Sequence, residues 1–143
     1  MILLGLDYGA KTVGVAVSDA LGLGATGVEI IRREKENHLR KTLSRIEELV
    51  REYKAEAIVV GHPVNMDGSV GERAEAAEAF AEMISKRIDL PLYLCDERLT
   101  SIEAEEIMRL NGVPRKDYKK YVDMIAAQVI LEDWMNNHTD ENN

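Results

Sequence analysis

The sequence has a single cysteine, Cys95, and lacks any long apolar run. One cysteine cannot form a disulfide within the chain, and no cysteine or histidine cluster has the spacing of a zinc site. The apolar runs fall well short of the roughly 20 residues that a membrane-spanning helix needs, so we expect no membrane contact. The N-terminus reaches Asp7 without a basic leader, and we interpret it as a strand rather than a signal peptide. These features predict a cytoplasmic protein.

Positive charge is also scarce. The chain has 18 Lys and Arg against 26 Asp and Glu, a net charge of -8, which argues against a nucleic-acid-binding protein with a uniformly basic surface. The basic residues gather in two segments: Arg32 to Lys54 holds eight Lys and Arg against five Glu, and Arg109 to Lys120 holds five against one Asp. Any contact with phosphate would therefore be local.

The length of 143 residues suits one ordinary domain, which we expect over residues 1–136, followed by a polar tail over 137–143. Three apolar, β-branched segments come first, and then helical periodicity alternates with short buried strands. This order predicts an α/β fold with a mixed sheet flanked by helices. The predicted strands are 2–7, 13–18, one within 23–32, 57–61 and 91–95, and the helices begin near 39, 69, 100 and 121. Ser69 to Glu72 and Thr100 to Glu103 have the spacing of capping boxes.

Charged residues follow two of the predicted buried strands. Ligands of open α/β sheets gather beyond the carboxyl ends of parallel strands, where Asp7 and Glu97 stand. A carboxylate that follows a nearly continuous apolar run is costly to desolvate unless something pairs with it. The alternatives are a turn aspartate beside Lys11 and a surface glutamate paired with Arg98. Taken together, the two acids are candidates for a site at this edge of the sheet.

A third acid, Asp123, lies in what we predict to be the first turn of a helix that is apolar on nearly every face. Such a helix must be buried, and the small side chains of Ala126 and Ala127 would let it approach the sheet. The alternative is that Asp123 only satisfies the preference of acids for helix N-termini, worth about 0.3 to 1 kcal/mol.

Three carboxylates at one edge would repel one another unless a cation lay between them. Oxygen-only ligands favour Mg²⁺ or Mn²⁺ over zinc. Such a site can orient a water for in-line attack on a phosphodiester and stabilise the departing oxygen. Gly61, with no side chain, would leave room beside it. Asp7, Glu97 and Asp123 are therefore our candidate metal ligands and catalytic residues.

Four motifs in order give the chain a family resemblance that spans nearly the whole domain. It resembles the YqgF family, also called RuvX, of pre-16S ribosomal RNA nucleases with likeness to Holliday junction resolvases. The motifs are Leu4-Gly5-Leu6-Asp7-Tyr8-Gly9-Ala10-Lys11 running into Gly14-Val15-Ala16-Val17-Ser18-Asp19, Val59-Val60-Gly61 with Pro63 and Asn65 to Ser69, Asp96 to Ser101, and Asp123 with Ala126-Ala127.

The resemblance implies a ribonuclease H-like fold with strand order 3-2-1-4-5 and a divalent-metal site on Asp7, Glu97 and Asp123. It also implies a hydrolase that matures the 5′ end of small-subunit ribosomal RNA, with precursor ribosomal RNA as partner and the small subunit as a further candidate. Two positions depart from the pattern: Thr12 replaces the usual arginine, and His62 replaces the usual leucine. His62 is a proton shuttle or, more commonly for a lone histidine, structural, and we assign it no role.

Basic residues next to the candidate ligands in sequence could hold an RNA backbone against the acidic centre. The alternative is a solvated loop whose cations offset neighbouring carboxylates. Asn65 to Ser69 could form a lip over the site, although turn chemistry also explains Asp67-Gly68. The candidate nucleic-acid-binding residues are Lys11, Arg98, Arg115, Lys116, Lys119 and Lys120.

The leading hypothesis is a metal-dependent endonuclease that acts on structured RNA. A second hypothesis is Holliday junction resolution on branched DNA, which rests on fold-level analogy. A third is an ATP-binding module, since Asp7-x-Gly9 resembles the first phosphate loop of the actin and sugar-kinase superfamily, although one domain of this length cannot clamp a nucleotide. A fourth is a non-catalytic ribosome-assembly or transcription factor.

Overall fold

A single five-stranded sheet organises the protein, in a computed structural model that describes residues 1–97 and 100–138 but not the side chains of Thr100 and Ser101. The strand order is β3-β2-β1-β4-β5, as the resemblance implied. The first three strands are antiparallel neighbours, and β4 and β5 run parallel to β1. Their bounds are β1 Leu3–Tyr8, β2 Thr12–Ser18, β3 Ala25–Arg32, β4 Ala57–His62 and β5 Leu92–Asp96.

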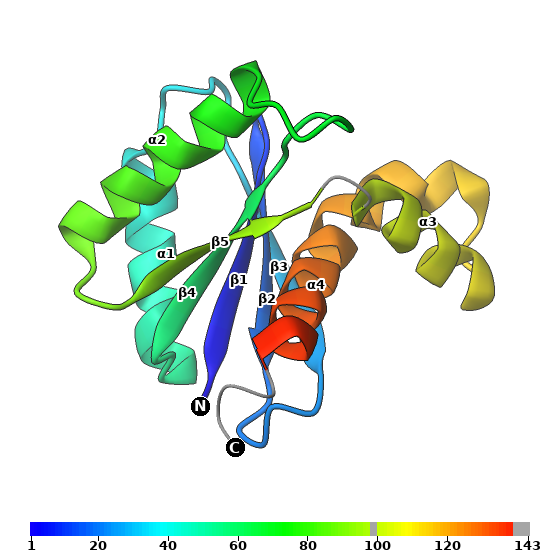
Figure 1. Ribbon diagram of the computed structural model, residues 1–143, viewed down its shortest axis with the longest axis horizontal. Helices are drawn as coiled ribbons and strands as arrows, with labels where there is room; N and C mark the ends of the chain where they lie inside the picture. Colours follow the sequence, from blue (N-terminus) through cyan, green and yellow to red (C-terminus); the bar gives the residue numbers. More distant parts are fainter. Residues whose placement is uncertain (98–99, 139–143) are drawn as a thin grey trace.

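Helices cover both faces of this sheet (Figure 1). On one face lie α1 (Arg40–Tyr53) and α2 (Glu72–Arg87), and on the other lies α4 (Tyr118–His138). The third helix, α3 (Thr100–Leu110), packs against α4 beside the sheet and is followed by a short 3₁₀ helix over Arg115–Asp117. None of the described helices is long and apolar enough to cross a membrane.

Strand alternation divides the core into two layers, because successive side chains point to opposite faces. Leu4, Leu6 and Tyr8 of β1 face α1 and α2, where Phe80 is fully buried. The layer between the sheet and α4 contains smaller residues, among them Ala16 and Ala57 of the strands and Ala127 of the helix. At Gly5 a Cβ would lie 2.4 Å from Leu131 Cγ, closer than packed atoms can approach. Small residues thus let α4 lie directly on the sheet, as the sequence predicted.

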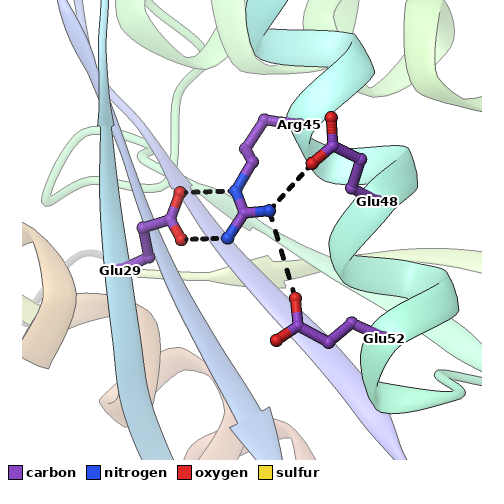
Figure 2. Close-up of polar contacts among 4 residues, drawn as sticks. All are labelled: Glu29, Arg45, Glu48 and Glu52. Carbon is purple, nitrogen blue, oxygen red and sulfur yellow. Dashed lines mark hydrogen bonds and ion pairs between the residues drawn. The ribbon is translucent and has the colours of Figure 1, made fainter.

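Helix α1 is joined to β3 by a network of ion pairs centred on Arg45 (Figure 2). The Arg45 guanidinium donates two hydrogen bonds to Glu29, of 2.6 and 2.9 Å. Its Nη1 atom lies 3.0 Å from Glu48 Oε2 and 4.0 Å from Glu52 Oε2. Three acids therefore surround one cation on this face of the molecule.

The predicted capping box at Ser69 does not form. Helix α2 begins at Glu72, with Gly71 as its N-cap and no side-chain capping bond within the described residues. Ser69 is occupied elsewhere: its hydroxyl and its backbone N–H both donate to Asp67 Oδ1, at 2.5 and 2.9 Å. Turn chemistry at Asp67-Gly68 thus competes successfully with helix capping.

The start of α4 also differs from the prediction. The helix begins at Tyr118, so Asp123 lies in its second turn and the first turn contains no acid. The segment before it is the 3₁₀ helix, which leads directly into Tyr118 and moves the helix start upstream. Helix-dipole preference acts mainly within the first turn. It therefore does not explain the acid at position 123.

Candidate active site

Asp7 and Glu97 meet at the carboxyl edge of the sheet. Asp7 is the penultimate residue of β1, and Glu97 directly follows β5, two strands away. Between them runs β4, where a Cβ at Gly61 would lie 2.7 Å from both Cδ and Oε1 of Glu97. The absent side chain lets the Glu97 carboxyl group reach across β4 to hydrogen-bond with Asp7. The predicted convergence of these strand ends is observed.

Burial and crowding alter the ionisation of this pair. Loss of water raises the pKa of Glu97 to about 9, and the nearby charges of Asp7 and Asp123 push it in the same direction. Burial also raises the pKa of Asp7 to about 6, although the hydrogen bond from Glu97 and the charge of Arg73 oppose that shift. At neutral pH Glu97 therefore keeps its proton and donates it in the hydrogen bond to the Asp7 carboxylate.

Asp123 belongs to α4, the helix that covers one face of the sheet. Its carboxylate is near enough to raise the pKa of both Asp7 and Glu97. Oδ2 of Asp123 accepts a hydrogen bond of 2.7 Å from the Thr12 hydroxyl at the start of β2. The residue that departs from the family pattern thus orients one of the three candidate carboxylates. From the sequence alone only the lost arginine is visible at this position, because the contact joins residues 111 positions apart.

Gly14 allows α4 to come this close. It pairs with Asp7 in the sheet, and a Cβ there would lie 1.9 Å from the backbone oxygen of Asp123. No side chain fits into that space, so the helix backbone rests directly on the strand. Gly14 belongs to the first family motif, which by itself indicates no role for it. A glycine facing a buried helix was the signal that could have identified it.

The three acids share one edge of the sheet but do not form a ready-made metal cage. Among residues 1–97 and 100–138, no three His, Cys, Asp or Glu side chains stand close enough together to hold a metal ion as they are. Within the same residues, no Lys or Arg forms an ion pair with Asp7, Glu97 or Asp123. The oxygen-only donor set, with a proton held between two of its members, nevertheless fits a hard divalent cation.

His62 has a structural environment. Its Nε2 atom lies 2.9 Å from Glu78 Oε2 of α2, and its backbone oxygen accepts a hydrogen bond from the Glu97 N–H. The first contact anchors the side chain to the helix, and the second fixes the chain where Glu97 leaves β5. The Asn65 to Ser69 loop is closed by its own bonds, including Asn65 Nδ2 to Ser69 Oγ at 2.9 Å.

The candidate nucleic-acid-binding cations that the structure describes lie in three separate elements of the fold. Lys11 is exposed in the β1–β2 turn, and Lys119 and Lys120 lie in the first turn of α4 rather than in a loop. Arg115 and Lys116 belong to the 3₁₀ helix, and Arg115 lines a hollow of about 390 Å³ together with Glu105 and Glu106. Arg98 lies outside the described residues.

Relatives of known name support the same family. The RuvX family, described as Holliday junction resolvase, matches residues 1–137. A protein of Agathobacter rectalis named "Putative pre-16S rRNA nuclease" is 48% identical over 135 residues, which is 94% of this chain and 94% of the relative. A protein of Listeria monocytogenes with the same name is 46% identical over 94% of this chain and 97% of its own length.

Solved structures of low sequence identity share the fold. Thermus thermophilus RuvC has a TM-score of 0.57 at 15% identity, covering 98% of this chain and 97% of RuvC. The fowlpox virus Holliday junction resolvase has a TM-score of 0.58 at 14% identity, covering 96% and 99%. The predicted ribonuclease H-like fold is confirmed by these similarities, and the sequence matches show that the chain belongs to the RuvX family.

Proposed function

We propose that this protein is a divalent-metal-dependent endonuclease that hydrolyses phosphodiester bonds in precursor 16S ribosomal RNA, in the cytoplasm. The observation that carries the proposal is the contact between Asp7 and Glu97 beside Asp123, with no described cation paired to any of them. Family membership and the names of the relatives support this class of substrate.

Asp7, Glu97 and Asp123 would hold Mg²⁺ or Mn²⁺ through their carboxylate oxygens. When bound, such a cation supplies water activation and stabilisation of the leaving oxygen in phosphodiester hydrolysis. Thr12 is a positioning residue, because its hydroxyl fixes the rotamer of Asp123. Gly61 and Gly14 keep the space in which the carboxylates converge. The raised pKa of Glu97 means that binding a cation must displace its proton.

The test is cleavage of precursor 16S ribosomal RNA by the purified protein with Mg²⁺ or Mn²⁺. Asp7→Asn preserves shape and removes one negative charge, and we expect it to lower the rate at least roughly a hundred-fold, since a misplaced reacting centre costs about that much. Asp89→Asn is the matched control, an exposed aspartate between α2 and β5 that should leave the rate unchanged. Equal rates for the wild type and Asp7→Asn would refute the proposal.

Holliday junction resolution is the second candidate, favoured by the description of the matching family. The same enzyme preparation is therefore offered a four-way DNA junction and precursor RNA side by side. Faster cleavage of the junction, lost in Asp7→Asn, would replace RNA with branched DNA as the substrate. Metal-independent RNA affinity without cleavage would instead indicate a non-catalytic assembly factor.

A further inference from the structure

A basic cavity lies between the end of β3 and the start of α1. Its volume is about 800 Å³, and its lining includes Arg32, Arg33, Arg40 and Lys41 with a single acid, Glu34. Such a concentration of positive charge is unexpected in a chain of net charge -8. It occupies part of the basic segment that the candidate active site does not use.

Most cations of this cavity are available to a ligand. Within the part of the chain that the structure describes, Arg32, Arg40 and Lys41 form no ion pair. Arg45 also contributes to the wall, but its charge is already matched by Glu29 and two further glutamates (Figure 2). The cavity therefore presents three exposed cations that are not paired, beside one arginine whose charge is already matched.

The start of α1 adds to the positive potential. Leu39, an apolar residue, is the N-cap, and no side chain of the described residues caps the helix. The first N–H groups of a helix have no intrahelical partner, and its N-terminus carries a partial positive charge. Its first turn contains Arg40 and Lys41 and no acid. Free N–H groups, a helix N-terminus and cations in one cavity are suited to phosphate oxygens.

Two connections join the cavity to the candidate active site. Arg32 pairs in the sheet with Thr12, which hydrogen-bonds to Asp123. Arg33 donates a 2.6 Å hydrogen bond to the backbone oxygen of Gly9, two residues beyond Asp7. Since neighbouring strands are about 4.8 Å apart, the β3 wall lies roughly 10 Å across the sheet from β1. By strand alternation Asp7 faces α4, whereas the cavity lies on the α1 side, so a polymer that reaches the carboxylates extends into the cavity by passing over the β1–β2 turn at the edge of the sheet.

Arg33 has one further unusual feature. Its guanidinium lies over the Tyr8 ring, 4.9 Å from the centroid, and Nε donates to the backbone oxygen of Glu36. The remaining nitrogen, Nη1, is buried and has no hydrogen-bond acceptor among the described residues. Among the described residues no carboxylate forms an ion pair with Arg33, so its positive charge adds to the attraction for an anion where the residue lines the cavity.

We propose that this cavity binds backbone phosphates of the nucleic-acid strand that flank the bond to be cleaved. The inference rests on the proposed function and extends it by naming where the substrate is held. The hollow at Arg115 is less suited to this task, because Glu105 and Glu106 offset the charges of Arg109 and Arg115 that line it. A substrate strand would pass from the carboxylate edge, over the β1–β2 turn, to the start of α1.

The test compares Arg40→Gln/Lys41→Gln with the control pair Arg51→Gln/Lys86→Gln. Each pair removes two positive charges from exposed helix positions. The control residues lie in the last turns of α1 and α2, whereas the cavity is at the start of α1. Affinity for a labelled precursor 16S RNA fragment is measured in EDTA at several salt concentrations, and circular dichroism checks that each variant is folded. Binding in EDTA does not depend on cleavage.

The cavity variant should bind RNA about tenfold more weakly, and the slope of log K against log salt should fall by about 1.4, as expected for two lost single-strand phosphate contacts. In cleavage assays its KM should rise while kcat stays unchanged. Unaltered affinity, or an equal loss in the control pair, would overturn the inference. A calorimetric titration with pyrophosphate distinguishes a free small anion from the phosphates of a nucleic acid. If only pyrophosphate binding depends on Arg40 and Lys41, the cavity serves a small anion and the inference is wrong.

The two proposals can fail separately. A wild type that cleaves no RNA but binds it through Arg40 and Lys41 refutes the nuclease and supports the cavity. Cleavage that needs Asp7 but does not depend on Arg40 and Lys41 supports the nuclease and refutes the cavity.

Discussion

Two groups of three carboxylates in this molecule differ in what lies between them. Glu29, Glu48 and Glu52 surround Arg45 (Figure 2), and the hydrogen bonds from Arg45 lower the pKa of Glu29. Asp7, Glu97 and Asp123 have no paired Lys or Arg among the described residues, and the pKa of both Asp7 and Glu97 is raised. The first group carries its own cation, whereas the second retains a proton in its place.

The cation or proton at the centre distinguishes a structural cluster of acids from a functional one. Acids that serve stability are neutralised by a side chain of the fold, and their charged forms are favoured. Acids that are crowded together without a cation lower stability, and such an arrangement persists where function needs it. The following experiments test whether the two groups respond in opposite ways.

The largest difference between the two groups of carboxylates should appear in the pH dependence of the free energy of unfolding. The pKa of Glu97 is raised from 4.5 to about 9, so the folded protein holds a proton that the unfolded chain releases between these values. Its stability should therefore fall as pH rises, by up to about 1.4 kcal/mol per pH unit. Glu97→Gln, whose amide can still donate to Asp7, should flatten this slope in EDTA-containing urea unfolding curves. Parallel slopes for the two proteins would contradict the pKa shift.

A smaller effect is expected at Thr12. Thr12→Val keeps the shape and loses the hydroxyl that holds Asp123, so the Mn²⁺ concentration for half-maximal cleavage should rise about tenfold, as for other residues that orient metal ligands. Thr12→Ser retains the donor and should behave like the wild type. Thr26→Val, an exposed position on β3, controls for the substitution itself. If serine and valine at position 12 act alike, the hydroxyl has no positioning role.

The smallest effect concerns the group that carries its own cation. Arg45→Met should lower the free energy of unfolding at neutral pH only slightly, because these ion pairs are partly exposed and screened by water. The lowered pKa of Glu29 means that this contribution is present above 4.5 and lost as pH falls through the folded value. The difference between variant and wild type should thus vanish on acidification. The stabilisation from Arg45 grows as pH rises, whereas the stabilisation from the Glu97 proton falls. A difference that persists in acid would assign the effect to packing.

The strand ends could be predicted from sequence because they depend on local patterns. Asp7 and Glu97 each follow a short apolar run, and parallel strands bring such residues to one edge. Their contact across Gly61 follows from the same pattern. Strand order itself came from the family resemblance, since local periodicity does not reveal which strands are neighbours.

The rest depends on pairings distant in sequence or on competing local contacts. The bond between Thr12 and Asp123 joins residues 111 positions apart and requires the β1–β2 register and the depth of α4 to be known. At Ser69 two local motifs competed, and the Asp67 turn prevailed over helix capping. The basic cavity arises where β3 and α1 meet, so the sequence indicated its charge but not its shape.

Calorimetric titration of Mn²⁺ into the wild type and Asp7→Asn, repeated in buffers of different ionisation enthalpy, measures cation binding and proton release without any nucleic acid. We predict that the wild type binds Mn²⁺ with release of about one proton near neutral pH, more tightly as pH rises, and that Asp7→Asn loses this binding. Equal binding by both proteins, or binding without proton release, would show that the carboxylates at this edge do not take a divalent cation in exchange for their shared proton.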